Sequence, residues 1–124
     1  MNIRIRHNLL FAPVSLTYSG NRMHCENALI DTGSAGSVFS IDRLVSIGIR
    51  PEPDDIVREL RGIGGTEFVF IKQVDELSLG NFHLNDFEIE IGAMDYGFEI
   101  DGIIGLDFLL RAKTKIDLEL LTIC

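Results

Sequence analysis

Apolar and polar residues alternate along much of the chain, which is the pattern of β-strands that bury one face in a core. Ile3 and Ile5 alternate with arginines, and residues 87–91 alternate apolar side chains with two glutamates. Residues 66–72, with the sequence TEFVFIK, are rich in the β-branched and aromatic residues that strands favour. Turn-forming pairs such as Gly80-Asn81 separate these runs at short intervals. The pattern therefore predicts a fold made mainly of short β-strands.

Helical patterns are confined to two short segments. Ser40 is a typical N-cap residue ahead of residues 41–47, and Gly48 follows them, where a helix commonly ends. A second short helix is predicted from residue 106 or 107 to about residue 112. Many strands with so little helix predict an all-β domain whose sheet closes into a barrel-like shape.

The length of 124 residues fits one domain, which we place over residues 1–124. Hydrophobic residues make up 46% of the chain, enough for a core and too many for a disordered protein. No run approaches the ~18 consecutive apolar residues of a membrane-spanning helix, and the N-terminus lacks the long apolar centre of a signal peptide. We therefore expect a single domain with no membrane partner.

Acidic residues outnumber basic ones by 19 to 11, which gives a formal net charge of -8. A nucleic-acid-binding domain would need a basic face against the phosphates, so this balance excludes that class of partner. Seven acidic residues and no basic ones lie in the stretch from Asp86 to Asp107. That stretch is either an ordinary solvated face or an acidic rim that favours cationic substrates, and the sequence leaves both open.

The cysteines and histidines show no arrangement typical of a disulfide framework or a metal site. The chain has two cysteines, Cys25 and Cys124, and its three histidines are scattered. Two such distant cysteines form neither a CxxC pair nor a zinc quartet, and reduced thiols are typical of the cytoplasm. We therefore predict a cytoplasmic protein that binds no metal and needs no cofactor.

The segment with the most chemical content begins where the apolar residues 28–30 lead directly into Asp31. An aspartate at the end of an apolar strand is costly unless hydrogen bonds or a catalytic use justify it. Thr32 and Ser34 supply hydroxyl groups, while Gly33 permits a tight turn and the close approach of a partner. The D-T-G string alone fits a structural turn equally well, so other segments must decide between the two.

Two further segments combine glycines with apolar residues. Residues 62–65, with the sequence GIGG, lie between two strand-like runs, which predicts a long hairpin with a glycine-rich tip. Residues 103–105, with the sequence IIG, lead into the second predicted helix. Neither cluster has the spacing of a phosphate-binding loop, and the first continues into a strand rather than a helix. Nucleotide binding is therefore not predicted.

Taken in order, the three segments closely resemble the retropepsin-like aspartic proteases, which include the retroviral and retrotransposon proteases and their stand-alone bacterial relatives. Residues 31–34 (DTGS) resemble the catalytic loop, residues 62–65 the flap tip, and residues 103–109 the apolar-apolar-glycine segment and closing helix. The resemblance covers about residues 10–120. It implies a single-domain, all-β retropepsin-like barrel with a flap hairpin, and an aspartic endopeptidase activity.

The resemblance also implies a homodimer with one active site at its two-fold axis. Each subunit would contribute Asp31, because the chain offers no second D-[ST]-G sequence. Two adjacent carboxylates share a proton, so one acts as a general base on water while the other polarises the scissile carbonyl. The implied partners are a second copy of the chain and a peptide or protein substrate.

Roles for individual residues follow from the same resemblance. Thr32 would reach the partner's loop, Gly33 would offer its carbonyl to the substrate, and Ser34 would support the loop. Retroviral members often have alanine where this chain has Ser34, and a hydroxyl that donates to the carboxylate would favour its charged form. We therefore predict an acidic pH optimum that moves upward in Ser34→Ala. Gly105 would pack beneath the loop, and Ile103 would form a wall of an apolar side-chain pocket. The residues expected to close over the substrate are Gly62, Ile63, Gly64 and Gly65.

Two questions have more than one answer at this point. The chain could instead be a catalytically silent retropepsin-like module that dimerises or binds peptides. The terminal residues 1–6 and 114–123 both have strand patterns, and they could join a dimer interface or only complete each subunit's own sheet. For the terminal residues, we favour a role in the dimer interface.

Overall fold

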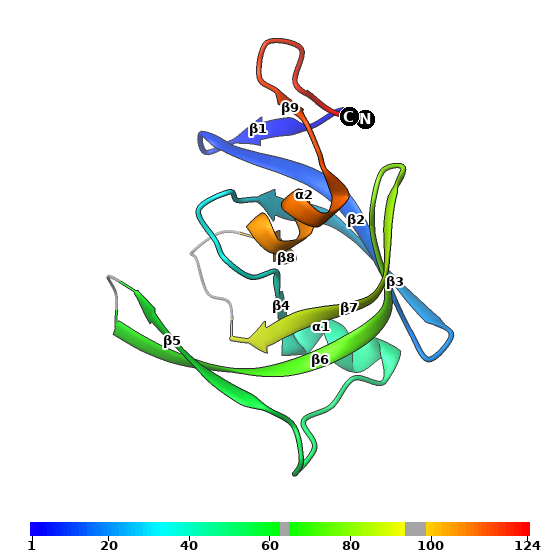
Figure 1. Ribbon diagram of the computed structural model, residues 1–124, viewed down its shortest axis with the longest axis vertical. Coiled ribbons are helices and arrows are strands. Elements are labelled where there is room, and N and C mark those ends of the chain that lie inside the picture. Colours follow the sequence, from blue (N-terminus) through cyan, green and yellow to red (C-terminus); the bar gives the residue numbers. More distant parts are fainter. Residues whose placement is uncertain (63–64, 94–98) are drawn as a thin grey trace.

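Eight strands of the described chain form one sheet, in the order β1-β2-β3-β8-β4-β7-β6-β5 (Figure 1). The structure is a computed structural model that describes residues 1–62, 65–93 and 99–124, without the side chains of residues 60–62 and 65–67. The strands of this sheet are β1 (Arg4–Arg6), β2 (Leu9–Tyr18), β3 (Asn21–Ile30), β4 (Val38–Ser40), β5 (Val57–Gly62), β6 (Gly65–Leu79), β7 (Phe82–Gly92) and β8 (Gly102–Ile104).

The sheet closes on itself because β2 pairs with β6 as well as with its neighbours in the sequence. The pairing is antiparallel and runs from Val14 opposite Leu79 to Thr17 opposite Glu76. Strands β2, β3, β8, β4, β7 and β6 therefore form a ring, and β1 and β5 extend it. Closure leaves the strands of the ring without free edges. The predicted all-β, barrel-like fold is confirmed.

The alternating pattern of β7 agrees with the burial of its side chains, except at one position. Phe87, Ile89 and Ile91 point into the core and are almost completely buried, while Glu88 is exposed. The same alternation predicts an exposed Glu90, but this residue is only 8% exposed. A glutamate on the polar face of β7 is therefore covered by another part of the molecule.

Both predicted helices are present. α1 (Ile41–Leu44) continues as a 3-10 turn, η1 (Val45–Ile47), and ends at Gly48, whose φ of 89° is the left-handed conformation that glycine adopts readily. Ser40 occupies the N-cap position without a capping hydrogen bond from its side chain. The second helix is α2 (Leu106–Ala112). No helix in the described part of the chain is long and apolar enough to cross a membrane.

The C-terminal residues differ from the prediction. The pattern of residues 114–123 predicts one strand, whereas the chain forms two short strands, β9 (Ile116–Asp117) and β10 (Thr122–Ile123), that pair antiparallel. Asp117 stabilises the turn between them, because its Oδ1 accepts hydrogen bonds from the next amides along the turn, at 2.9 Å each. The hydrogen bonds from these amides to the Asp117 side chain end the strand at Asp117, whereas hydrophobic alternation alone predicts that the strand continues.

The two chain termini lie next to each other (Figure 1). The amide of Ile123 donates to the carbonyl of Met1 at 2.9 Å, and the N-terminal ammonium group donates to the carbonyl of Ile123 at 2.8 Å. The amide of Ile3 donates to the carbonyl of Leu121 at 3.0 Å. The terminal residues therefore pair within the subunit, and their use in a dimer interface stays a prediction.

Candidate active site

Asp31 stands at the point where β3 leaves the barrel. β3 runs parallel to β8, with Ile30 opposite Ile104, and both of these residues are buried. The Asp31 amide continues the ladder by donating to the carbonyl of Ile104 at 3.0 Å, while the residue itself is only partly buried. Two of the segments singled out in the sequence, residues 28–34 and 103–105, are therefore neighbours in the sheet.

A tight turn orients the Asp31 carboxylate. The Gly33 amide donates to Asp31 Oδ1 at 2.9 Å, and the Ser34 amide donates to the Asp31 carbonyl at 3.2 Å. Thr32 and Gly33 are exposed at the tip of this turn. The carboxylate is thus fixed by the backbone while its surroundings stay accessible to water or to a second molecule.

The hydroxyl of Ser34 does not act as the sequence suggested. It donates to the carbonyl of Gly36 at 2.8 Å rather than to the carboxylate of Asp31. The carbonyl of Ser34 accepts a hydrogen bond from the amide of Leu106 at 2.7 Å. Ser34 therefore ties residues 34–36 into a compact loop, and it gives no reason to expect a shifted pH optimum in Ser34→Ala.

Gly105 lies directly beneath this loop. A Cβ atom at position 105 would come within 2.6 Å of the carbonyl carbon of Gly36 and within 2.8 Å of the Ser34 oxygen, both of which are backbone atoms. Real Cβ atoms do not approach backbone so closely, and backbone in a hydrogen-bonded loop has little room to move. Only glycine fits at this position, in agreement with the packing expected from the sequence.

A buried polar network, which the sequence pattern did not indicate, supports the loop. Ser37 is completely buried, and its amide and hydroxyl donate to the two carboxylate oxygens of Asp107, at 3.1 and 2.8 Å. The hydroxyl of Ser37 in turn accepts a hydrogen bond from the Gly105 amide at 3.0 Å. An aspartate in the first turn of a helix is common. No local sequence pattern indicates that its hydrogen-bond partner lies 70 residues away.

Removing the Asp107 carboxylate should destabilise the protein. In Asp107→Ala, two buried donors of Ser37 lose their acceptor, and we expect the free energy of unfolding to fall by about 2 kcal/mol. The matched control is Asp117→Ala, whose carboxylate bonds two amides in an exposed turn, where water can replace it. Urea unfolding of both variants checks this, and equal losses would contradict a supporting role for Asp107.

The predicted flap and pocket residues are only partly described. Gly62 and Gly65 lie opposite each other at the ends of β5 and β6, so the predicted hairpin is present, while Ile63 and Gly64 lie outside the described residues. Ile103 is 6% exposed and belongs to a small apolar cluster with Phe11 and Leu29. Its role as a wall of a substrate pocket stays a prediction.

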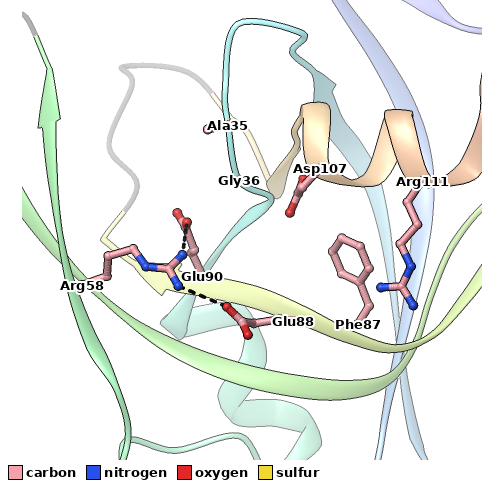
Figure 2. Close-up of a pocket in the computed structure, with 8 residues that line it drawn as sticks. All are labelled: Ala35, Gly36, Arg58, Phe87, Glu88, Glu90, Asp107 and Arg111. Atoms are coloured by element: carbon pink, nitrogen blue, oxygen red, sulfur yellow. Dashed lines mark hydrogen bonds and ion pairs between the residues drawn. The ribbon is translucent and has the colours of Figure 1, made fainter.

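A cavity of about 330 Å³ opens beside the loop (Figure 2). Five of its eight lining residues are charged, and they belong to β5, β7 and α2. Sequence reasoning did not identify this cavity, since its walls combine segments far apart in the chain. The residues that line it are Ala35, Gly36, Arg58, Phe87, Glu88, Glu90, Asp107 and Arg111.

Comparison with known families agrees with this geometry. A family model described as "Aspartyl protease" matches residues 14–108 of the chain. The matched span includes the turn at Asp31, the β5–β6 hairpin and Gly105, which are the three segments discussed above. No match is found among curated proteins.

Proposed function

Because the chain belongs to the aspartyl protease family, we propose that it is a retropepsin-like aspartic endopeptidase that is active as a homodimer. The observation that carries the proposal is the turn at Asp31, whose carboxylate is held by the Gly33 amide at 2.9 Å and stays partly exposed. A carboxylate used only to stabilise a turn could be fully buried or replaced by a neutral amide. A general base must instead be oriented and reachable by water.

The proposed mechanism needs two copies of Asp31. The chain has one D-T-G sequence, and a single carboxylate cannot both accept a proton from water and donate one to the scissile carbonyl. Two carboxylates about 3 Å apart across a two-fold axis cannot both ionise, so they share a proton and divide these roles. The exposed side chain of Thr32 is available to bond the partner's loop and to hold the two carboxylates in register.

We propose that the substrate binds extended between the catalytic loops and the β5–β6 hairpins. In that position the carbonyl of Gly33 would accept a hydrogen bond from the peptide backbone, in the manner of an added strand. Gly62, Ile63, Gly64 and Gly65 would close over the peptide and exclude water. Ile103 would contribute to an apolar side-chain pocket once the second subunit is in place.

Cleavage of a mixed peptide library by the purified protein, between pH 4 and 7, tests the proposed function. We expect cleavage that is blocked by a transition-state mimic with a central hydroxyl group, because such a group takes the place of the attacking water. Binding of peptides without any cleavage would instead support a catalytically silent module.

Mixing subunits tests the shared active site. An excess of Asp31→Asn protein should inhibit the wild type, because each wild-type subunit would then pair mostly with an inactive partner. At a roughly ninefold excess, the activity per wild-type subunit should fall about tenfold after the subunits have exchanged. Measuring peptide cleavage in such mixtures checks this, and activity that does not respond to the excess would argue for an active monomer.

We also propose that the protein works in the cytoplasm. Both cysteines are free, with Cys25 buried and Cys124 exposed. Burial, with a smaller contribution from the nearby charge of Asp101, raises the pKa of the Cys25 thiol to about 11, so this thiol is a neutral core group at physiological pH. Free thiols are common in reducing compartments, which supports this location.

A further inference from the structure

The cavity beside the catalytic loop has a defined charge. Arg58 of β5 donates to Glu88 and to Glu90 of β7, with N–O distances of 3.3 Å in each case (Figure 2). One guanidinium group therefore serves two carboxylates, and the trio carries one net negative charge when both glutamates are ionised. The Glu90 side chain is 10% exposed, whereas that of Glu88 is 58% exposed. The surplus negative charge is therefore accessible at Glu88.

The other two charged residues of the cavity each have a partner within the protein. Both carboxylate oxygens of Asp107 accept hydrogen bonds from Ser37, so the negative charge of Asp107 is stabilised by the loop that it supports. The guanidinium group of Arg111 lies over the ring of Phe87, 5.7 Å from its centroid. These two opposite charges leave the balance of the cavity unchanged, and three carboxylates face two guanidinium groups overall.

The position of the cavity connects it with the proposed substrate path. Ala35 and Gly36 belong to the loop that begins at Asp31, and Arg58 belongs to the hairpin expected to cover the substrate. A peptide that lies extended between the loop and the hairpin places alternate side chains toward opposite walls. One of them would enter this cavity, whose volume of about 330 Å³ accepts a single long side chain.

We propose that this cavity is an outer subsite that binds a lysine or arginine side chain of the peptide, with Glu88 as its principal acceptor. The proposal rests on the proposed function and adds a preference that the function alone does not supply. The aliphatic part of such a side chain would lie against Ala35, and its charged end would reach the carboxylate of Glu88. The acidic stretch of the sequence would then act as a rim that favours cationic substrates.

The preference should weaken in acid because of Glu90. Desolvation raises the pKa of its carboxyl group, the facing charge of Arg58 opposes this shift, and the charges of Asp107 and Glu88 add to it. Glu90 therefore becomes neutral at a higher pH than an ordinary glutamate does. As it does so, Arg58 becomes free to neutralise Glu88, and the cavity loses its surplus negative charge.

The experiment compares peptide pairs that differ at one position, with lysine, norleucine or glutamate at successive sites around the cleaved bond. At one site, the wild type should cleave the lysine peptide about two- to fivefold better than the norleucine peptide, which is the range expected for a partly exposed ion pair. Glu88→Gln should bring this ratio close to one. Glu88→Lys should instead cleave the glutamate peptide best. Such a reversal would mean that the charge at position 88, and not a loss of folding, causes the change in peptide preference.

The matched controls are Glu26→Gln and Glu26→Lys, which change an exposed glutamate on β3 by the same charge. They should keep the wild-type ratio. If Glu88→Gln also keeps it while cleavage still depends on Asp31, the subsite proposal is wrong and the proposed function stands. If no peptide is cleaved at all, the proposed function fails and the subsite proposal falls with it.

Discussion

Replacing Asp31 with asparagine is expected to lower kcat/KM for peptide cleavage by about 10²–10⁴-fold, the contribution typical of a general acid–base residue. In a homodimer the substitution removes both carboxylates at once, and an amide can neither take a proton from water nor share one with its partner. The fold should survive, because the Oδ1 of asparagine can still accept the hydrogen bond that Gly33 donates at 2.9 Å. Peptide cleavage and urea unfolding, measured on the same preparation, check both statements.

The matched control for this variant is Asp75→Asn, which makes the same chemical change at an exposed position of β6. It should keep wild-type cleavage and stability. Residual cleavage by Asp31→Asn at a tenth of the wild-type rate or more would show that another group activates water. Loss of folding in Asp31→Asn would contradict the second statement, and inhibition of the wild type by the transition-state mimic would then test the catalytic role instead.

Replacing Gly105 with alanine is expected to destabilise the protein by at least about 3 kcal/mol, at the upper end of the range for overpacked cores. The new methyl group would overlap the backbone of Ser34 and Gly36, which the hydrogen bond from Leu106 to the Ser34 carbonyl holds in place at 2.7 Å. A natural domain has only about 5–15 kcal/mol of stability, so this loss is a large share of the total, and the loop would shift to relieve the overlap. Such a shift also misplaces Asp31 and lowers the rate of peptide cleavage.

Gly36→Ala is the matched control, because it adds the same methyl group to the other side of this contact. That methyl group would meet the end of the Glu90 side chain, with Cδ at 2.7 Å, and not backbone. A flexible side chain can turn away, so the stability lost should be clearly smaller. Urea unfolding midpoints of the two variants provide the test, and equal midpoints would contradict the account given for Gly105.

Sequence reasoning succeeded where the physical cause is local. Alternation at residues 87–91 identified a strand, Gly48 marked the end of a helix, and the turn residues around residues 62–65 indicated a hairpin. The turn at Asp31 was also accessible, because an aspartate directly after a buried apolar run needs an explanation. In each case the residues that determine the structure are neighbours in the chain.

Sequence reasoning failed where a side chain finds its partner through the fold. The acidic stretch from Asp86 to Asp107 was interpreted as surface charge, either a solvated face or an acidic rim, yet Glu90 and Asp101 are buried and Asp107 supports the loop. Asp101 Oδ2 accepts a hydrogen bond from the Asn27 amide at 3.0 Å, across the junction of β3 and β8. From composition alone, such residues are interpreted as surface charges. Their hydrogen-bond partners depend on the order of the strands in the sheet, which spacing along the sequence does not reveal.

The parallel pairing of β3 with β8 has a consequence for the order of events during synthesis. The loop at Asp31 is complete only when Gly105 lies beneath it and Asp107 bonds Ser37, and these residues are separated by about 70 positions. Contacts so distant in the chain form late in folding, because closing a long loop costs entropy before any contact forms. A nascent chain that has emerged only as far as β7 thus carries Asp31 on an unsupported loop. Proteolytic competence would therefore require that residues 103–107 have been synthesised and have packed against the loop.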